Sequence, residues 1–237
     1  MSSASEETLV RAPSVVANAA PKPAGPKHAG HVVAGGSWTH LLARAAVRRL
    51  VGTWVTPNHL TTLRLVTGLM ACAAFALGSR SGDIWGGVLW ILSAFLDRAD
   101  GELARIGGKT SAWGHKYDYI CDNAVTALFF LAAGIGAHDG ALGWLGVLLG
   151  ALAGGAILAS NIFSEALEKS DGSGRRAYAG AAGFDLDDLL YLCGPAAWLG
   201  WLAPILIGAA MVAPTMALIT LWRLRRIVRQ RAVEAAI

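Results

Sequence analysis

Four aspartates stand in two closely spaced pairs near the middle of the chain. Asp97 and Asp100 are three residues apart, and Asp118 and Asp122 are four residues apart. On a helix these spacings place both members of a pair on one face. Carboxylates that share a site repel one another unless cations lie between them. Ligands that are all oxygen favour magnesium, manganese or calcium over zinc.

Small residues and one arginine accompany these aspartates at helical spacing. Gly101, Ala104 and Gly114 each stand about one helical turn from an aspartate, so they leave room for a ligand beside a metal. Glycine also lets a phosphate approach the backbone closely. Arg105 supplies a planar and permanently charged donor that suits a diphosphate.

The composition is typical of a membrane protein. Of the 237 residues, 54% are hydrophobic and 15% are charged, whereas soluble domains carry about 25% charged residues. Charged side chains inside a membrane are costly, so the four aspartates indicate function. The net charge of +4 lies mainly beside apolar segments, which predicts a lipid bilayer as partner and no nucleic acid. The isolated Cys72, Cys121 and Cys193 are predicted to be packing residues.

The segments that carry the aspartates are predicted to be helices. We predict an all-α, polytopic membrane protein with six transmembrane helices, preceded by an amphipathic interfacial helix. The predicted regions are a disordered tail without a signal peptide (1–36), a juxtamembrane helix (37–55), a membrane domain (56–222) and a basic cytoplasmic tail (223–237). The predicted spans are 58–79, 84–105, 111–137, 141–164, 186–201 and 203–222.

Basic residues predict how the chain is oriented. Nearly all lysines and arginines that flank the predicted spans fall on one side, and only Arg80 falls on the other. The positive-inside rule then places both termini and the aspartates at the cytoplasmic side, most simply of a bacterial inner membrane. The short connection through Gly107 and Gly108 predicts that the second and third spans are antiparallel neighbours, so that all four carboxylates meet.

The same residues form a recognisable pattern, DxxDGxxAR followed by eight residues and GxxxDxxxD, which runs from Asp97 to Asp122 without exception. In this pattern the chain resembles the CDP-alcohol phosphotransferases. The resemblance implies that two Mg²⁺ or Mn²⁺ ions assist transfer from a CDP-linked lipid to an acceptor alcohol, with release of CMP. It also implies that Asp122 is the base. The implied metal ligands are Asp97, Asp100, Asp118 and Asp122, and the implied nucleotide and diphosphate contacts are Gly101, Ala104, Arg105 and Gly114.

Several residues keep two interpretations. The sequence PNHLT at 57–61 is similar to the family's entry into its first helix. Asn58 and Thr61 are therefore either nucleotide contacts, or an N-cap and an ordinary helical threonine. Arg64 likewise either belongs to the nucleotide pocket or is a snorkelling residue at the interface. The doublet Arg175-Arg176 either binds a phosphate of the acceptor or only sets orientation.

Two further hypotheses concern substrate and assembly. The predicted donor is CDP-diacylglycerol, and the alternative is soluble CDP-choline or CDP-ethanolamine with a lipid acceptor. A cation transporter is the alternative of another class, which the position of Arg105 beside the acids argues against. A stripe of small residues permits close helix contact, either within the bundle or, as the resemblance to the family favours, in a homodimer. Its members are Gly143, Gly146, Gly150 and Gly154.

Overall fold

The computed structural model describes residues 38–171 and 186–234, and all regular structure in this part of the chain is helical. The predicted all-α class is thereby confirmed for these residues. The elements in chain order are α1 (Trp38–Val47), η1 (Arg48–Leu50), α2 (Pro57–Ala76), α3 (Arg80–Ile106), α4 (Ala112–Gly136), α5 (Trp144–Asp171), η2 (Leu186–Leu192), α6 (Cys193–Trp198) and α7 (Leu202–Glu234).

In the described part of the chain, four helices are long and apolar enough to cross a membrane, namely α2, α4, α5 and α7. The 27-residue helix α3 is also long enough, but the charged side chains of its second half reduce its hydropathy. The predicted span at 186–201 consists of the 3₁₀ helix η2 and the six-residue helix α6. Together these are too short to cross a hydrocarbon core of about 30 Å. The chain is thus an integral membrane protein, and its six-span count stays a prediction.

Helix α2 begins where local chemistry favours a start. Pro57 occupies its first position, where the fixed φ of proline suits a helix and no N–H is lost. The backbone N–H of Thr56 donates to Nδ1 of His59 at 3.3 Å, which completes the cap. The N-cap interpretation of Asn58 was therefore wrong, because Asn58 is the second residue of the helix. Serine N-caps precede both α3 and α4.

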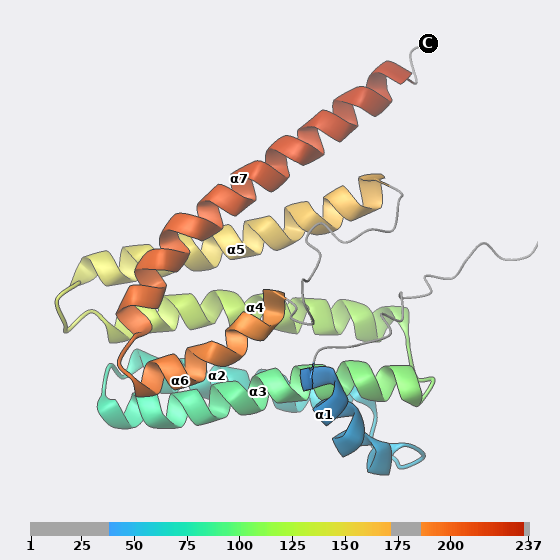
Figure 1. Cartoon of the computed structure of the whole chain (residues 1–237), viewed down its shortest axis with the longest axis horizontal. Coiled ribbons are helices and arrows are strands. Elements are labelled where there is room, and N and C mark those ends of the chain that lie inside the picture. Colours follow the sequence, from blue (N-terminus) through green and yellow to red (C-terminus); the bar gives the residue numbers. More distant parts are fainter. Residues whose placement is uncertain (1–37, 172–185, 235–237) are drawn as a thin grey trace, which may run out of the picture. The chain divides into compact units, whose positions relative to one another are not determined.

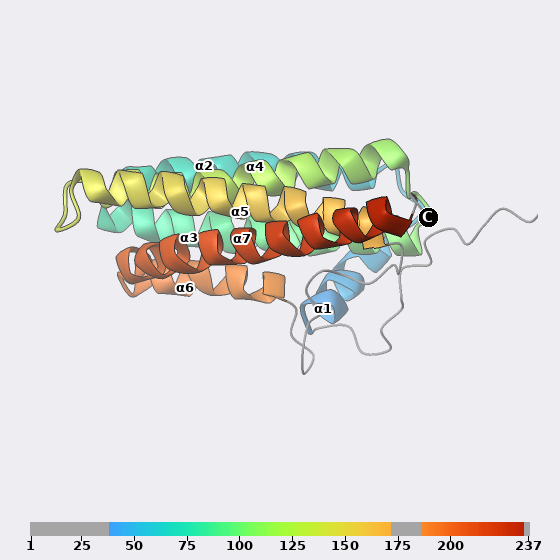
Figure 2. The same cartoon turned by 90° about the horizontal axis from the view of Figure 1, so that it is seen from above.

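Helix α2 packs against both α3 and α4, while α4 packs on α5 and α5 on α7 (Figures 1 and 2). The backbones of α3 and α4 approach one another less closely than either approaches α2, and the predicted antiparallel neighbours meet through their side chains. Their long side chains do meet, since the rings of Trp90 and Phe129 lie 4.3 Å apart between centroids. Their backbones are separated because α2 contacts both, and this separation leaves space for a site.

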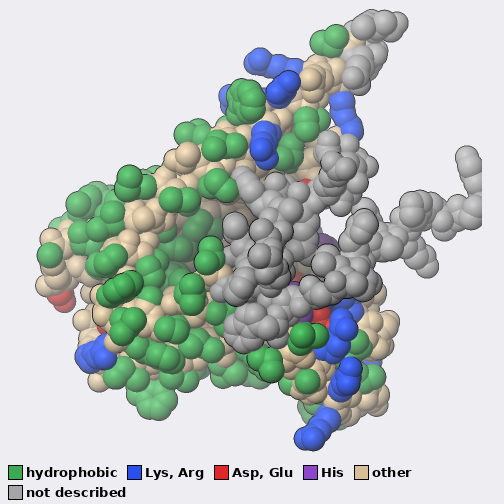
Figure 3. All heavy atoms as spheres, viewed as in Figure 1, with side chains coloured by type: hydrophobic (Ala, Val, Ile, Leu, Met, Phe, Trp, Pro, Cys, Tyr) green, Lys and Arg blue, Asp and Glu red, His purple; other side chains and the backbone are tan. Residues whose placement is uncertain are grey.

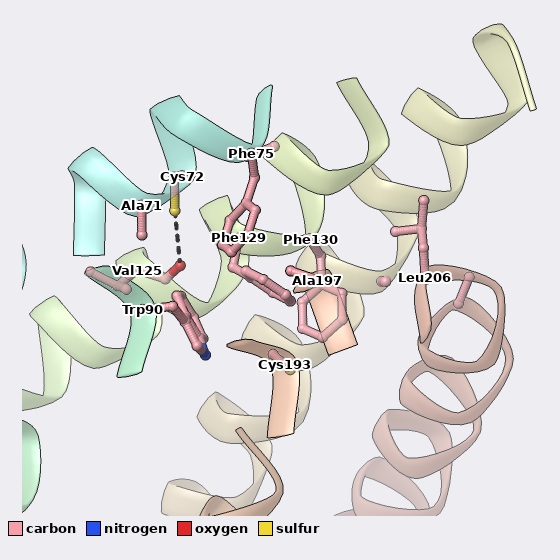
Figure 4. Close-up of a cluster of buried hydrophobic side chains, with 13 residues drawn as sticks. Ala71, Cys72, Phe75, Trp90, Val125, Phe129, Phe130, Cys193, Ala197 and Leu206 are labelled. Carbon is pink, nitrogen blue, oxygen red and sulfur yellow. Dashed lines mark hydrogen bonds between the residues drawn. The ribbon is translucent and has the colours of Figure 1, made fainter. Parts of the chain in front are cut away.

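An aromatic cluster fixes these three helices (Figure 4). Phe129 of α4 lies edge-on to Phe75 of α2 at 5.5 Å and edge-on to Phe130 at 5.0 Å. All these side chains are buried, as is Trp90 of α3. Trp90 precedes Asp97 by about two helical turns. The cluster therefore fixes the position of α3 along its axis, and its rotation about that axis, where it carries the acidic residues.

The predicted juxtamembrane segment forms α1 and η1. Ala43 and Val47 are buried where α1 packs on α3, whereas Leu41 and Leu42 are exposed. Contact with a membrane surface stays a prediction for that exposed face. At the other end of the chain, α7 continues without a break to Glu234. The predicted span 203–222 and the first part of the basic tail are therefore one helix.

The glycine stripe of α5 faces α4. A Cβ on Gly150 would lie 2.5 Å from the carbonyl oxygen of Phe130, and one on Gly154 would lie 2.5 Å from that of Ala127. Gly143 lies before α5, with a φ of +52° in the connection, so it is not part of the helical stripe. The stripe serves a contact within the chain, and the homodimer stays a prediction without its support.

Candidate functional site

Three aspartates converge where the second half of α3 faces the first half of α4. Asp97, Asp100 and Asp118 each contribute one carboxylate oxygen to a group whose members lie within 4.8 Å of one another. Asp100 is buried, while the other two are partly exposed. The helical spacing predicted this convergence, and three of the four aspartates meet as expected.

Asp122 lies one turn after Asp118 and is not part of the group of three. Its Oδ1 accepts a hydrogen bond from Nη2 of Arg64 at 2.6 Å. Its carboxylate is partly exposed, at 42%. The four aspartates therefore divide into three that converge and one that is held beside them by an arginine.

Arg64 of α2 lies inside the bundle and contacts the aspartates. It is only 4% exposed, and its Nη1 lies 2.9 Å from Oδ1 of Asp97 and 3.1 Å from Oδ1 of Asp118. With the contact to Asp122, one guanidinium bridges three carboxylates from two helices. The snorkelling interpretation was wrong because the counter-charges lie inside the bundle. The available signal was an arginine within an apolar span, which requires a partner of opposite charge.

The start of α2 supplies two further contacts. Oγ1 of Thr61 donates to Oδ2 of Asp100 at 2.7 Å in a buried environment, so Thr61 is more than an ordinary helical threonine. Oδ1 of Asn58 lies 3.1 Å from the position that a Cβ on Gly114 would occupy. The two residues of α2 singled out by the resemblance thus lie against residues of the signature.

The last turns of α3 carry the remaining signature residues. Nε of Arg105 donates to the carbonyl oxygen of Gly101 at 3.1 Å, so its side chain folds back along the helix. This side chain is 55% exposed. Ala104 lies in the same turn and is half-buried. The arginine doublet at 175–176 lies outside the described residues.

A cavity opens beside the acidic group, between α3, α4 and η2. Its wall is mainly polar at the end near the aspartates and becomes apolar toward Trp90 and Val125. The hydroxyl group of Tyr191 donates to the carbonyl oxygen of Ala94 at 2.8 Å, which fixes η2 on α3. The polar lining residues are Arg64, Ser93, Asp97, Arg98, Asp122, Thr126 and Tyr191.

The donor set fits a hard divalent cation. It consists of carboxylate oxygens alone, which are the ligands that Mg²⁺ and Mn²⁺ prefer. The carboxylates lie on α3 and α4, and α2 packs against both helices. Arg64 already brings positive charge to the same carboxylates. Asp97, Asp100 and Asp118 could therefore hold a metal ion, with Asp122 close by.

Comparison with known proteins agrees with this geometry. A family model described as CDP-alcohol phosphatidyltransferase matches residues 54–227. The archaetidylinositol phosphate synthase of Pyrococcus horikoshii is 36% identical over 89 residues, which are 37% of this chain and 46% of that protein. The match thus spans less than half of that relative. The crystal structure of Mycobacterium tuberculosis phosphatidylinositol phosphate synthase with CDP-DAG bound has the same fold, with a TM-score of 0.59, 17% identity and coverage of 79% of this chain and 93% of that one.

Proposed function

Because the chain belongs to the CDP-alcohol phosphatidyltransferase family, we propose that it transfers a phosphatidyl group from CDP-diacylglycerol to the hydroxyl group of an acceptor and releases CMP. The observation that carries the proposal is the convergence of Asp97, Asp100 and Asp118. Membership in this family of enzymes removes the cation transporter as an alternative.

The residues of the site have three roles in the proposed reaction. Asp97, Asp100 and Asp118 would hold divalent ions, which supply positive charge against the diphosphate when bound. Arg105 binds the diphosphate, with Gly101 and Ala104 leaving room for it. Asn58, Thr61 and Gly114 form the nucleotide side of the site, where a larger side chain at Gly114 would meet Asn58.

The acceptor reacts from the cavity beside the acidic group, whose wall includes the partly exposed carboxylate of Asp122. The acceptor oxygen attacks the phosphorus that carries diacylglycerol, and its proton passes to Asp122. The bond from that phosphorus to the bridging oxygen breaks, and CMP leaves with the electron pair.

For the acceptor we propose a phosphorylated polyol, with inositol phosphate the first to test. Two relatives carry names of inositol phosphate lipid synthases. The cavity offers hydroxyl and guanidinium groups from Ser93, Thr126, Tyr191 and Arg98. Arg175 and Arg176 would add positive charge for the phosphate of the acceptor.

The test is CMP release by the purified protein with Mg²⁺ or Mn²⁺. Labelled CDP-diacylglycerol and, separately, CDP-ethanolamine are each offered with inositol phosphate, glycerol phosphate, serine and diacylglycerol. We expect product only from CDP-diacylglycerol, with inositol phosphate as the best acceptor. Product from CDP-ethanolamine and diacylglycerol alone would instead establish the soluble-donor alternative. Asp97→Asn is the matched inactive control.

A further inference from the structure

A second charged network lies on the other flank of α3, centred on Glu102. This residue is fully buried, with 0% exposure, and follows Gly101 directly in the signature. Its Oε1 lies 3.2 Å from Nη2 of Arg105 and 3.1 Å from Nδ1 of His40, and its Oε2 accepts from Nε of Arg44 at 2.9 Å. A buried carboxylate is tolerated only when it is well paired, and this one has partners on two helices.

The network fixes the guanidinium of Arg105. Its Nε donates to the carbonyl oxygen of Gly101 at 3.1 Å, and Nη2 on the same edge of the guanidinium lies 3.2 Å from Oε1 of Glu102. Nη2 also lies 3.3 Å from the position of a Cβ on Gly101, so the group lies over the glycine. A long and half-exposed side chain is thereby held in one direction, and within 38–171 and 186–234 its Nη1 donors have no partner and are available to a ligand.

Glu102 itself is turned away from the acidic group. It follows Asp97 by five residues, which corresponds to a rotation of about 140° around the helix. On that flank it is covered by α1, whose Val47 packs with Ala99 and Leu103 of α3 in an apolar cluster. The juxtamembrane helix therefore closes over the carboxylate and supplies Arg44 and His40 to it.

We propose that Glu102 is a positioning residue that aims Arg105 at the diphosphate of the donor, and that α1 holds Glu102 in this role through Arg44 and His40. The inference rests on the proposed function, because it takes Arg105 as the diphosphate ligand. Glu102 has no contact with the reacting groups and acts through Arg105 alone. The juxtamembrane helix is then part of the donor site, although it is distant in sequence from the signature.

A double-mutant cycle of Glu102→Gln with Arg105→Lys tests this inference. Two readouts are measured for each variant, namely the KM for CDP-diacylglycerol and the Kd for CDP alone by calorimetry in the presence of Mn²⁺. Glu102→Gln alone should weaken both by about tenfold, the scale of one hydrogen bond to a charged group, and leave the KM for the acceptor unchanged. In the Arg105→Lys background it should add no further loss.

Equal losses from Glu102→Gln in both backgrounds would overturn the inference, because Glu102 would then act independently of Arg105. If Glu102→Gln fails to fold, the same cycle is measured with Arg44→Gln in place of Glu102→Gln, because Arg44 holds Glu102 from α1. Glu165→Gln is the matched control, since Glu165 of α5 pairs with Lys169 of its own helix at 2.5 Å and interacts with Tyr119 of α4, and so belongs to a different charge pair from that of Glu102 and Arg105. A wild-type enzyme that binds CDP without releasing CMP from any donor would contradict the proposed function, while the CDP cycle would still decide the role of Glu102.

Discussion

Arg64 brings positive charge to the acidic group before any metal binds. Three of the four aspartates lie within ion-pair distance of its guanidinium, whose side chain is only 5% exposed. Four neighbouring carboxylates without a cation would repel one another in a medium of low dielectric constant. The arginine thus lets the aspartates converge in the metal-free protein, and bound metal would share them with it.

Replacing Arg64 should destabilise the metal-free protein most. We expect Arg64→Gln to lower its stability by about 3 to 5 kcal/mol, the usual cost of removing one partner from a buried ion pair. Divalent metal should restore more stability to this variant than to the wild type, because it supplies the missing charge. Thermal melting in detergent, with chelator and with added Mn²⁺, measures both effects.

Arg229→Gln is the control for Arg64→Gln, since Arg229 is exposed on α7. Its melting temperature should match that of the wild type under both conditions. If Arg64→Gln melts like the wild type with chelator, Arg64 is not the cation that allows the aspartates to converge.

The converging aspartates should be essential for turnover but not for folding. We expect Asp97→Asn, Asp100→Asn and Asp118→Asn each to reduce CMP release by at least about a thousandfold, since a metal ligand contributes several kcal/mol to the transition state. Folding should persist, because Arg64 keeps other carboxylate partners and Thr61 can still donate to an amide oxygen at position 100. Full activity of any of these variants at its normal melting temperature would contradict the metal site.

At this scale the sequence predicts residues whose role depends on helical spacing. The aspartates, Gly101 and Gly114 are spaced by turns of a helix, so their faces follow from the sequence alone. The contacts of Arg64 with the aspartates and of Glu102 with α1 cannot be read from the sequence alone. They join different helices, so they depend on how the helices pack. Arg64 could have been assigned only by pairing a buried cation with the known acids.

At the scale of helices, the contact between α4 and α5 depends on glycine. A Cβ at Gly154 would approach the backbone of Ala127, whereas a Cβ at the adjacent Gly155 would meet nothing within 4 Å. Gly154→Ala should therefore destabilise the protein by about 1 to 3 kcal/mol through overpacking, and Gly155→Ala should be nearly neutral. Thermal melting of the two variants under one condition gives the comparison. Equal melting temperatures would show that the α4–α5 contact tolerates a methyl group.

Helix positions were more predictable than helix contacts. Apolar length and breakers such as Pro57 and the turn at Gly107-Gly108 gave the four apolar spans and α3 to within a few residues, except that α5 and α7 run further. The antiparallel α3 and α4 meet through their side chains as predicted, but the closer packing of α2 on each was not predicted, because a short turn fixes only the order of two helices. It does not exclude α2, which is distant from the turn in sequence, from packing on both.

At the scale of the whole chain, apolar and basic surfaces separate along the bundle. Hydrophobic side chains cover much of the visible bundle surface, whereas many lysine and arginine side chains in view lie along the C-terminal half of α7 and near α1 (Figure 3). Six tryptophans near the ends of the predicted spans are more than half exposed, as an interfacial belt requires. They are Trp54, Trp85, Trp113, Trp144, Trp201 and Trp222.

The basic segments are directed toward one end of the bundle, because the α3–α4 connection and the C-terminal ends of α5 and α7 all point that way, although the end of α7 diverges from the others (Figures 1 and 2). The positive-inside rule predicts that this end faces the cytoplasm. Single cysteines test it: Asp139→Cys in the α4–α5 connection, where the side chain is 98% exposed, and Arg229→Cys on α7. The three native cysteines are buried and should react little. In intact bacterial cells an impermeant maleimide should label position 139 alone, and position 229 only after permeabilisation. The reverse pattern would place the aspartates on the outer side and contradict the proposed cytoplasmic site.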